Sequence, residues 1–494
     1  MKGNIMGDRP NILWYCSDQQ RFDTIGALNN PHINTPRLDG FMKEAVTFTH
    51  AFCQSPICTP SRSSFLTGMY LSAVGVNQNG NPLFPTYYED RLVTKRLTDV
   101  GYDCGLAGKL HLSTAANGQE PRVDDGYRYF QYSHDHKGPR RYGHDYAEWL
   151  RAQGVEPDEM MATPTDIKTY LQGAKQARFG GIKEPTEAQD NFPPHLHQTH
   201  WCSEKAIEFI DKNRDEGQPW LMSINPFDPH APFDPPYEYY KRYDPESLPG
   251  AHFEAGDLET QKRLVDAGVD FQSEPEHPDA RDHKVMQAAY YAMIELVDFE
   301  FGRILDHLEA TGQRENTIVV FMSDHGEMLC DHGLVLKGCR FYEGLTRVPL
   351  MVSWPGHFGE GVVSDALVEL MDLVPTFYEA AGEEIPYWVQ GKSLMPVLKG
   401  ETSDHRDFVR TEFFGAIAYP DQTHGTMYRD KKWKLVRYHG KEVCELYNLE
   451  NDPWEHNDLS EDPACRDVLL DLMRKSFDAT ALAYAPGQPR KNHY

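Results

Sequence analysis

The most informative stretch of this sequence is Cys58-Thr59-Pro60-Ser61-Arg62-Ser63-Ser64-Phe65-Leu66-Thr67-Gly68. Thr59 is a good N-cap, Pro60 suits the first helical position and Gly68 suits the exit, so the stretch predicts a short helix over residues 60–67. The Cys58 thiol would then lie at the positive end of that helix, where the pKa of a thiol falls and anions bind. Arg62, one turn into the helix, adds a cation that would hold either the thiol or an oxyanion.

Short apolar runs that stop abruptly at polar residues predict buried strands on either side of this helix. They are residues 11–16, 220–224, 318–322 and 348–352. Between them, residues 285–311 predict a long helix with one apolar face, and Gly312 supplies the stop. Strands that alternate with helices indicate an α/β fold with a large mixed, mainly parallel sheet flanked by helices. Ligands of such sheets bind in the crevice beyond the carboxyl ends of the strands.

The length of 494 residues is too great for one ordinary core, so we expect one large domain and a smaller one. We predict a catalytic domain over residues 1–400, in which residues 115–195 form an excursion over one rim of the sheet. From residue 401 the pattern changes to shorter, alternating strands such as residues 432–438, followed by a helix near residues 465–477. We therefore predict a small α+β subdomain and tail over residues 401–494.

Composition excludes several classes of function. The formal net charge of −26 gives no electrostatic footprint for nucleic acid or for an anionic bilayer. No apolar run approaches the length of about 20 residues that a transmembrane helix needs, and the first residues do not resemble a signal peptide. The nine cysteines are few for this length and odd in number, which is typical of a reducing compartment. We predict a cytoplasmic location with no nucleic-acid or membrane partner.

The eleven-residue stretch also carries a resemblance to a known family. Cys58-x-Pro60-Ser61-Arg62, followed by Leu66-Thr67-Gly68, resembles the signature of the type I sulfatases, which are members of the alkaline-phosphatase-like superfamily. In that family a separate formylglycine-generating enzyme converts the cysteine to formylglycine, whose hydrated aldehyde is the nucleophile. The resemblance implies that Cys58 is matured in this way and that Arg62 orients it.

Further motifs resemble family positions in the family's order. They are Asp18-Gln19, Gly108-Lys109-Leu110-His111, Pro229-His230, Ser323-Asp324-His325-Gly326-Glu327 and Lys337. The resemblance implies that Asp18, Gln19, Asp324 and His325 bind one divalent metal together with an oxygen of the matured Cys58. Family precedent gives calcium, but an amide and an imidazole bring less charge and a softer donor than calcium prefers, so manganese or magnesium stays open. A carboxylate at the end of a strand can also be a plain helix cap.

The remaining motif residues are implied to handle charge and protons. The resemblance places Lys109 and Lys337 against the sulfate oxygens, where ammonium groups stabilise the transferring group. It assigns His230 to protonation of the leaving alcohol and His111 to deprotonation of the formylglycine diol, although the sequence cannot separate these two roles. The implied reaction is hydrolysis of a sulfate monoester to an alcohol and inorganic sulfate through attack by the diol.

Two alternatives remain at this stage. A phosphonate monoester or phosphodiester hydrolase of the same superfamily would share the formylglycine signature and the metal residues. The Gly108-Lys109-Leu110-His111 element favours the sulfatase, because its two cations suit a compact sulfate better than a diester. From a different class, the chain would be a non-catalytic protein that binds a metal and an anion if Cys58 is never matured.

The sequence does not identify the substrate. Carbohydrate, aryl and small alkyl sulfates all stay open, as does the choice between exo and endo action. Lys137, Arg140 and Arg141 in the excursion would hold a uronate or a second sulfate, although such a loop is more often simply solvated. The extended tail from Ala483 to Tyr494 is of a kind that reaches over a neighbouring subunit, and on this basis we predict a homo-oligomer.

Overall fold

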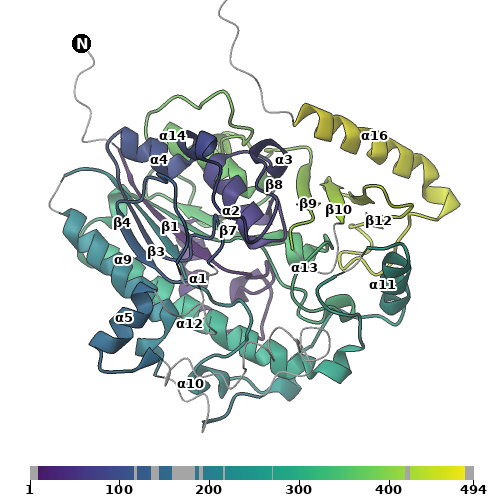
Figure 1. Ribbon diagram of the computed structural model, residues 1–494, viewed down its shortest axis with the longest axis horizontal. Helices are drawn as coiled ribbons and strands as arrows, with labels where there is room; N and C mark the ends of the chain where they lie inside the picture. Colours follow the sequence, from purple (N-terminus) through teal and green to yellow (C-terminus); the bar gives the residue numbers. More distant parts are fainter. Residues whose placement is uncertain are drawn as a thin grey trace, which may run out of the picture.

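A large sheet forms the centre of the protein (Figure 1). The computed structural model describes residues 9–115, 119–134, 144–157, 184–187, 193–214, 217–269, 271–417 and 423–483. The order of the strands is β4-β3-β5-β1-β6-β7-β2-β8. Their bounds are β1 (Asn11–Ser17), β2 (Val46–Phe52), β3 (Asp103–Gly108), β4 (Tyr129–Tyr132), β5 (Trp220–Asn225), β6 (Thr317–Ser323), β7 (Arg347–Ser353) and β8 (Val362–Glu369). All four strands predicted from apolar runs are present.

The sheet is mixed and mainly parallel, as predicted. Only β7 runs antiparallel to its neighbours, β6 and β2, while the other neighbouring strands are parallel. The register between β1 and β6 pairs Ser17 with Ser323. Asp18 and Asp324 therefore leave the sheet at the same edge and from adjacent strands, which places two carboxylates at the carboxyl end of the sheet.

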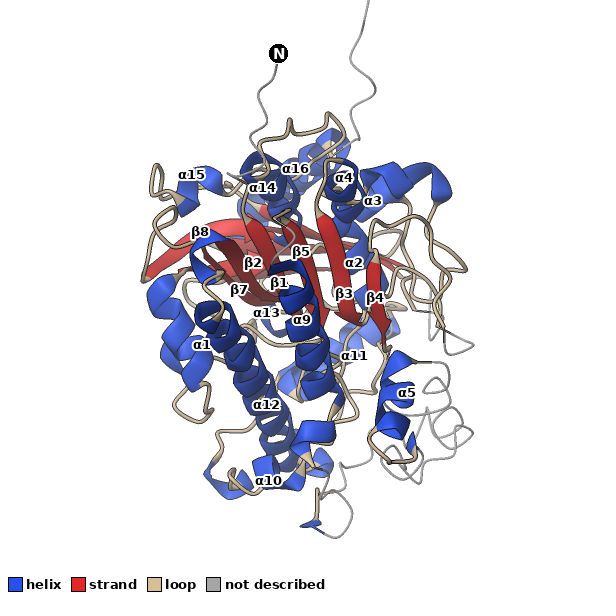
Figure 2. Cartoon of the chain, turned by 90° about the vertical axis from the view of Figure 1, so that its left-hand side faces the viewer, coloured by secondary structure: helices blue, strands red, loops and turns tan. Residues whose placement is uncertain are grey.

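Helices cover both faces of the sheet (Figure 2). One face carries α2 (Cys58–Thr67), α3 (Leu71–Val74), α4 (Val93–Asp99) and α14 (Leu373–Ala380), and the other carries α1 (Pro36–Phe41), α9 (Gln198–Arg214) and α12 (His283–Ala310). Phe65 and Phe377 pack in the core on the first face, and Phe209 and Phe301 pack in the core on the second. The predicted helix over residues 285–311 is confirmed as α12, with Gly312 in the left-handed region just beyond it.

The start of α2 differs from the prediction. The helix begins at Cys58, with Ile57 as the extended N-cap residue, so Thr59 is not the cap and Pro60 is not the first helical residue. Pro60 is tolerated because the first backbone bond of the helix runs from Ser61 N to Ile57 O, and Pro60 lacks an N–H where none is needed. The amide of Thr59 is satisfied by Asn79 Oδ1 at 3.0 Å, from a distant segment. Gly68 ends the helix in the left-handed conformation, as predicted.

The C-terminal part contains an antiparallel sheet, seen at the right of Figure 1. It consists of β9 (Val409–Phe414), β10 (His424–Arg429), β11 (Trp433–Tyr438) and β12 (Cys444–Asn448), and the helix α16 (Arg466–Leu482) packs against it through Leu472. The remaining α-helices are short: α5 (Asp145–Ala152), α10 (Tyr237–Tyr240), α11 (Asp257–Asp266), α13 (Glu343–Thr346) and α15 (Met395–Leu398). In the described part of the chain, every helix is too short or too polar to cross a membrane.

Residues 115–195, which were predicted to form an excursion over one rim of the sheet, also supply a strand of the sheet itself. Their strand β4 pairs in parallel with β3 and extends the central sheet, which was not predicted from the sequence, and the segment also contains the short helix α5. Lys137, Arg140 and Arg141, and the tail beyond Ala483, lie outside the described residues.

Candidate active site

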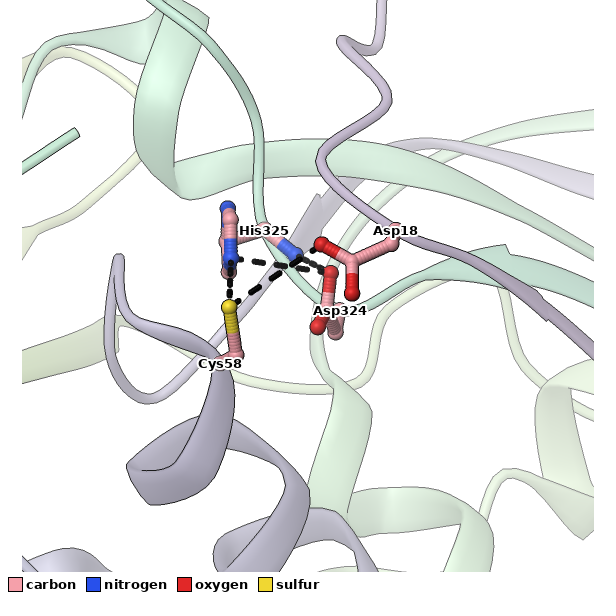
Figure 3. Close-up of side chains that lie close together, drawn as sticks. All are labelled: Asp18, Cys58, Asp324 and His325. Atoms are coloured by element: carbon pink, nitrogen blue, oxygen red, sulfur yellow. Dashed lines mark hydrogen bonds and ion pairs between the residues drawn. The ribbon is translucent and has the colours of Figure 1, made fainter. Parts of the chain in front are cut away.

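Cys58 lies at the N-terminus of α2, below the carboxyl edge of the sheet. Its Sγ atom lies 3.1 Å from His325 Nε2, 2.9 Å from Lys337 Nζ and 3.9 Å from Asp18 Oδ1. Figure 3 shows the side chains of Asp18, Asp324 and His325 converging on the thiol from the ends of β1 and β6. All of the predicted site residues lie around this thiol or contact a residue that does.

Charge around Cys58 favours an anion at this position. Burial alone would raise the pKa of the thiol, but Lys109, Lys337 and His325 hold this pKa well below its ordinary value. The thiol is buried at the first position of a helix, where free backbone N–H groups add to the positive potential. The site can therefore hold an anionic group on residue 58 or a small anion beside it.

Arg62 joins the two carboxylates that leave the sheet together. Its Nε donates to Asp324 Oδ2 at 2.9 Å, and its Nη2 lies 3.2 Å from Asp18 Oδ2. A third bond runs from Nη1 to the carbonyl oxygen of Lys109 at 2.9 Å. The guanidinium is fully buried, so these bonds are not weakened by solvent. Arg62 thus holds three strand ends in one arrangement.

Lys109 is placed by the close approach of two strands. A Cβ at Gly108 would lie 2.0 Å from the carbonyl oxygen of Asn225, and Gly108 has a φ of 108°, so only glycine fits here. The chain then turns and directs the buried ammonium group of Lys109 onto Asp18 Oδ2. Burial lowers the pKa of this ammonium group, but Asp18 outweighs burial and raises it above its ordinary value. Lys109 is a fixed cation in this site.

Lys337 lies where several acceptor atoms converge. Its Nζ is 2.7 Å from Gln19 Oε1, 2.8 Å from His230 Nε2, 2.9 Å from Cys58 Sγ and 3.2 Å from His325 Nε2. It comes from the loop between β6 and β7 and is almost completely buried. This ammonium group connects the predicted metal ligands to His230.

Gln19 is oriented by a residue for which the sequence suggested no role. The amide Nε2 of Gln19 donates to Glu327 Oε2, so that Oε1 faces Lys337. Glu327 is fully buried and its other oxygen accepts from the backbone N–H groups of Leu329 and Leu336. Tyr290 donates to the carbonyl oxygen of Gln19 at 2.5 Å. The motif around Asp324 contained Glu327, but only the fold brings it to Gln19.

His111 and Glu120 form a second unit beside Cys58. The carboxylate of Glu120 accepts from the backbone N–H groups of His111, Leu112 and Ser113 at 2.7, 2.5 and 2.8 Å. These bonds hold a turn in which His111 has a positive φ of 57°. The imidazole of His111 reaches the Cys58 thiol, and burial followed by Lys109 lowers its pKa to about 3. No feature of the sequence pointed to Glu120.

His230 contacts Lys337 and, like His111, reaches the Cys58 thiol. Its Nδ1 donates to the carbonyl oxygen of Ala231 at 2.6 Å, which leaves the Nε2 lone pair directed at Lys337. Burial and then Lys337 lower the pKa of this imidazole below its ordinary value. His111 and His230 are therefore both neutral near pH 7, and either can accept a proton from a group at Cys58.

The donor atoms fit a divalent cation. Ligand atoms of Asp18, Cys58, Asp324 and His325 all lie within 4.8 Å of one another and are buried. His325 donates through Nδ1 to Gly326 O at 2.9 Å, so its Nε2 faces the cluster and would be the atom that binds a metal. The remaining predicted ligand atom, Gln19 Oε1, accepts from Lys337 Nζ at 2.7 Å. Two carboxylates, one amide oxygen and one imidazole form a donor set that suits calcium, magnesium or manganese.

A thiol at a helix N-terminus, paired carboxylates and two ammonium groups meet at the carboxyl edge of a mainly parallel sheet, which is the arrangement implied by the resemblance to the alkaline-phosphatase-like hydrolases. Comparison with known proteins narrows this class. The family model described as Sulfatase matches residues 10–383, more than half of the chain, and the one described as N-sulphoglucosamine sulphohydrolase, C-terminal, matches residues 330–481. The chain belongs to the sulfatase family, and the prediction of a sulfuric ester hydrolase is confirmed.

Similar proteins cover nearly the whole chain. An arylsulfatase of Clostridium perfringens is 29% identical over 97% of this chain and 96% of its own length. The phosphonate monoester hydrolase SpPMH from Silicibacter pomeroyi has the same fold, with a TM-score of 0.78 at 24% identity, covering 97% and 96% of the two chains. The structure of BT4656 with its substrate D-glucosamine-2-N,6-O-disulfate has a TM-score of 0.70 at 21% identity, covering 98% of this chain and 100% of that one.

Proposed function

We propose that this protein hydrolyses a sulfate monoester to an alcohol and inorganic sulfate, with Cys58 matured to formylglycine and one divalent metal at Asp18, Gln19, Asp324 and His325. The observation that carries the proposal is the position of two buried ammonium groups, Lys109 and Lys337, at the thiol of residue 58. Such a pair neutralises a compact dianion or monoanion at the nucleophile.

Each side chain then has a defined task. Arg62 keeps Asp18 and Asp324 aligned and offsets their mutual repulsion. Lys109 and Lys337 bind the sulfate oxygens and stabilise charge on the leaving oxygen. His230 and the Lys337 ammonium group that it contacts together deliver a proton to the leaving alcohol. His111, neutral and adjacent to residue 58, takes a proton from the second hydroxyl group of the diol, so that the aldehyde re-forms as sulfate is expelled.

Two groups absent from the unmodified chain complete this chemistry. The matured residue 58 supplies a hydroxyl nucleophile in place of a thiol, and a metal at the four ligands supplies Lewis-acid polarisation of the sulfate. Calcium is the metal we propose, with manganese and magnesium as alternatives for the same donor set.

For the natural substrate we propose a class of compound, a carbohydrate sulfate or an aryl sulfate. A carbohydrate sulfate is supported by the sulfated glucosamine bound to BT4656, and an aryl sulfate by the name of the C. perfringens relative. The partners we propose are this ester, a formylglycine-generating enzyme and further copies of the chain. The cytoplasmic location stays a prediction.

A phosphonate monoester or phosphodiester hydrolase is the second candidate. It is supported by the fold of SpPMH and by the combination of Gln19 and His325 among the metal ligands. Lys109 argues against it, because a fixed cation beside residue 58 suits a compact sulfate better than a diester. His111 is neutral near pH 7 and, contrary to the expectation from the sequence, adds no second cation.

The test combines mass spectrometry with paired assays. The chain is expressed with a formylglycine-generating enzyme, and the peptide that contains residue 58 is weighed. The same sample is assayed with an aryl sulfate, a glucosamine sulfate and a phenyl phosphonate ester, with Cys58→Ala as the control. Aldehyde at residue 58 together with faster sulfate turnover supports the proposal. Aldehyde with faster phosphonate turnover selects the second candidate, and an unmodified thiol rejects both.

A further inference from the structure

A second group of metal-binding side chains lies away from Cys58. It consists of Asp257 at the start of α11, His332 in the loop between β6 and β7, and His456 after β12. One ligand atom from each residue lies within 4.8 Å of the others. Three segments that are distant in the sequence therefore meet at one point, between the loop that leads to Lys337 and the C-terminal part.

The distances in this group match those of a small coordination sphere. His456 Nδ1 lies 3.0 Å from each carboxylate oxygen of Asp257, and His332 Nδ1 lies 3.3 Å from Asp257 Oδ1. Ligand atoms in a tetrahedral zinc site with bonds of about 2.0 to 2.1 Å are about 3.3 Å apart. A cation of that size fits between these atoms after shifts of a few tenths of an ångström.

The charge balance at Asp257 also favours a cation. In the described part of the chain, the ion-pair partners of Asp257 are His332 and His456, and neither is permanently charged. The side chains of Asp257 and His332 are 1% and 4% exposed, so solvent does little to screen the carboxylate. Burial lowers the pKa of His332, but Asp257 outweighs burial and raises it above its ordinary value, so a proton on this histidine balances the carboxylate when no metal is bound. A metal ion would take the place of that proton and bind both histidines in the neutral form.

The side chains are held in place before any ion binds. His332 stacks on Tyr342 with ring centroids 3.8 Å apart and an angle of 11° between the planes. Asp257 Oδ2 accepts from Glu254 N at 2.8 Å, which orients the carboxylate. His456 is 14% exposed, so an ion can enter from its side and a water molecule can complete the coordination.

We propose that Asp257, His332 and His456 form a second metal site that binds one zinc ion. Two imidazole nitrogens and one carboxylate oxygen are a donor set of zinc and chemically similar transition metals, whereas calcium prefers oxygen ligands alone. The bound ion fastens the C-terminal part to the loop that carries His332 and, further on, Lys337. The proposal does not depend on maturation of Cys58.

The test counts zinc ions. Wild-type protein, His456→Gln and the control His307→Gln are stripped with a chelator, dialysed against Zn²⁺ and analysed by elemental mass spectrometry. His307 forms a surface pair with Asp211 at 2.8 Å and lies outside both metal clusters, so its loss should leave zinc binding unchanged. Wild type and His307→Gln should each hold one zinc more than His456→Gln, whether or not zinc also enters the Cys58 cluster.

A second measurement tests the proposal without a variant, in case His456→Gln fails to fold. Crystals of wild-type protein grown with Zn²⁺ should show an anomalous peak at the zinc edge between the three side chains. Equal zinc content in wild type and folded His456→Gln would overturn the proposal, as would an anomalous map with a peak only beside Cys58. In either case the group would consist of two imidazole–carboxylate hydrogen bonds and nothing more.

Discussion

Arg62 Nε donates a 2.9 Å hydrogen bond to Asp324 Oδ2, and this bond joins the second turn of α2 to the end of β6. The same guanidinium reaches Asp18 at the end of β1. Because β1 and β6 are adjacent and parallel, the two carboxylates would repel each other without a shared cation. Arg62 therefore has a structural task in addition to any contact with the substrate.

Replacement of Arg62 by alanine should destabilise the fold. It leaves two buried carboxylates without their shared partner, and the expected loss in the free energy of unfolding is about 3–5 kcal/mol. Urea denaturation of metal-free protein measures this loss. Arg474→Ala, which removes an exposed ion pair with Asp471, should cost less than about 1 kcal/mol. Equal denaturation midpoints for Arg62→Ala and wild type would contradict the view that Arg62 stabilises the fold by pairing with both Asp18 and Asp324.

Replacement of Lys109 by alanine should distinguish the two candidate reactions. We expect kcat/KM for an aryl sulfate to fall by about 10²- to 10³-fold, because a fixed positive charge beside the transferring group is lost. Turnover of a phenyl phosphonate ester should fall less, so the ratio of the two activities shifts toward the phosphonate. Lys399→Ala, an exposed lysine, serves as the control. An equal loss on both esters would indicate that Lys109 acts only through its bond to Asp18.

The sequence was sufficient for those parts of the site that depend on a single strand end. Asp18 and Asp324 follow apolar runs directly, and a parallel sheet brings such ends to one edge whatever the details of packing. The signature stretch pointed to Cys58 and Arg62 through its resemblance to the sulfatase signature, and the helix that carries both residues is a local feature. The alternation of strands and helices was likewise enough to predict the mixed, mainly parallel sheet.

Contacts between distant segments were not predictable. Asn79, from a distant segment, satisfies the backbone amide of Thr59 at the start of α2. Glu327 accepts from the side-chain amide of Gln19, and Glu120 accepts from the backbone amide of His111. Only the folded chain brings these groups together. Strand β4 escaped prediction because it is short, and its pattern of burial is not that of a central strand. The Asp257, His332 and His456 group combines three segments with no common motif.

Replacement of Glu327 by glutamine should weaken metal binding. The new amide would present an NH₂ group or a single oxygen to Gln19, so that Gln19 Oε1 no longer turns reliably toward the metal ligands. Loss of such an orienting partner typically costs 10- to 100-fold in metal affinity, and we expect a loss on the order of 10-fold here. Calorimetric titration with Ca²⁺ and Mn²⁺ measures it. Glu309→Gln on the exposed side of α12 is the control, and an unchanged Kd in Glu327→Gln would remove Glu327 from this role.

Glu120 should make the stability of the protein depend on pH. Burial raises its pKa from an ordinary 4.5 to about 7, although its three backbone donors oppose that shift. The folded state then binds the proton more tightly than the unfolded state does, so this group lowers the free energy of unfolding as the pH rises from 4.5 to about 7. Glu120→Gln, which does not titrate, should show a smaller decline over the same window.

The comparison of Glu120→Gln with wild type separates the titration of the Glu120 carboxyl from that of other groups with similar pKa values. Urea denaturation at several pH values gives the difference in the free energy of unfolding, which should shift in favour of the variant as the pH rises. A constant difference would mean that Glu120 is ionised in the folded protein throughout.

Activity provides a second readout for Glu120→Gln. A single glutamine oxygen cannot accept from His111, Leu112 and Ser113 together, so His111 loses its fixed position. We therefore expect kcat to fall while KM changes little, because the proposed role of His111 is to transfer a proton and not to bind the ester.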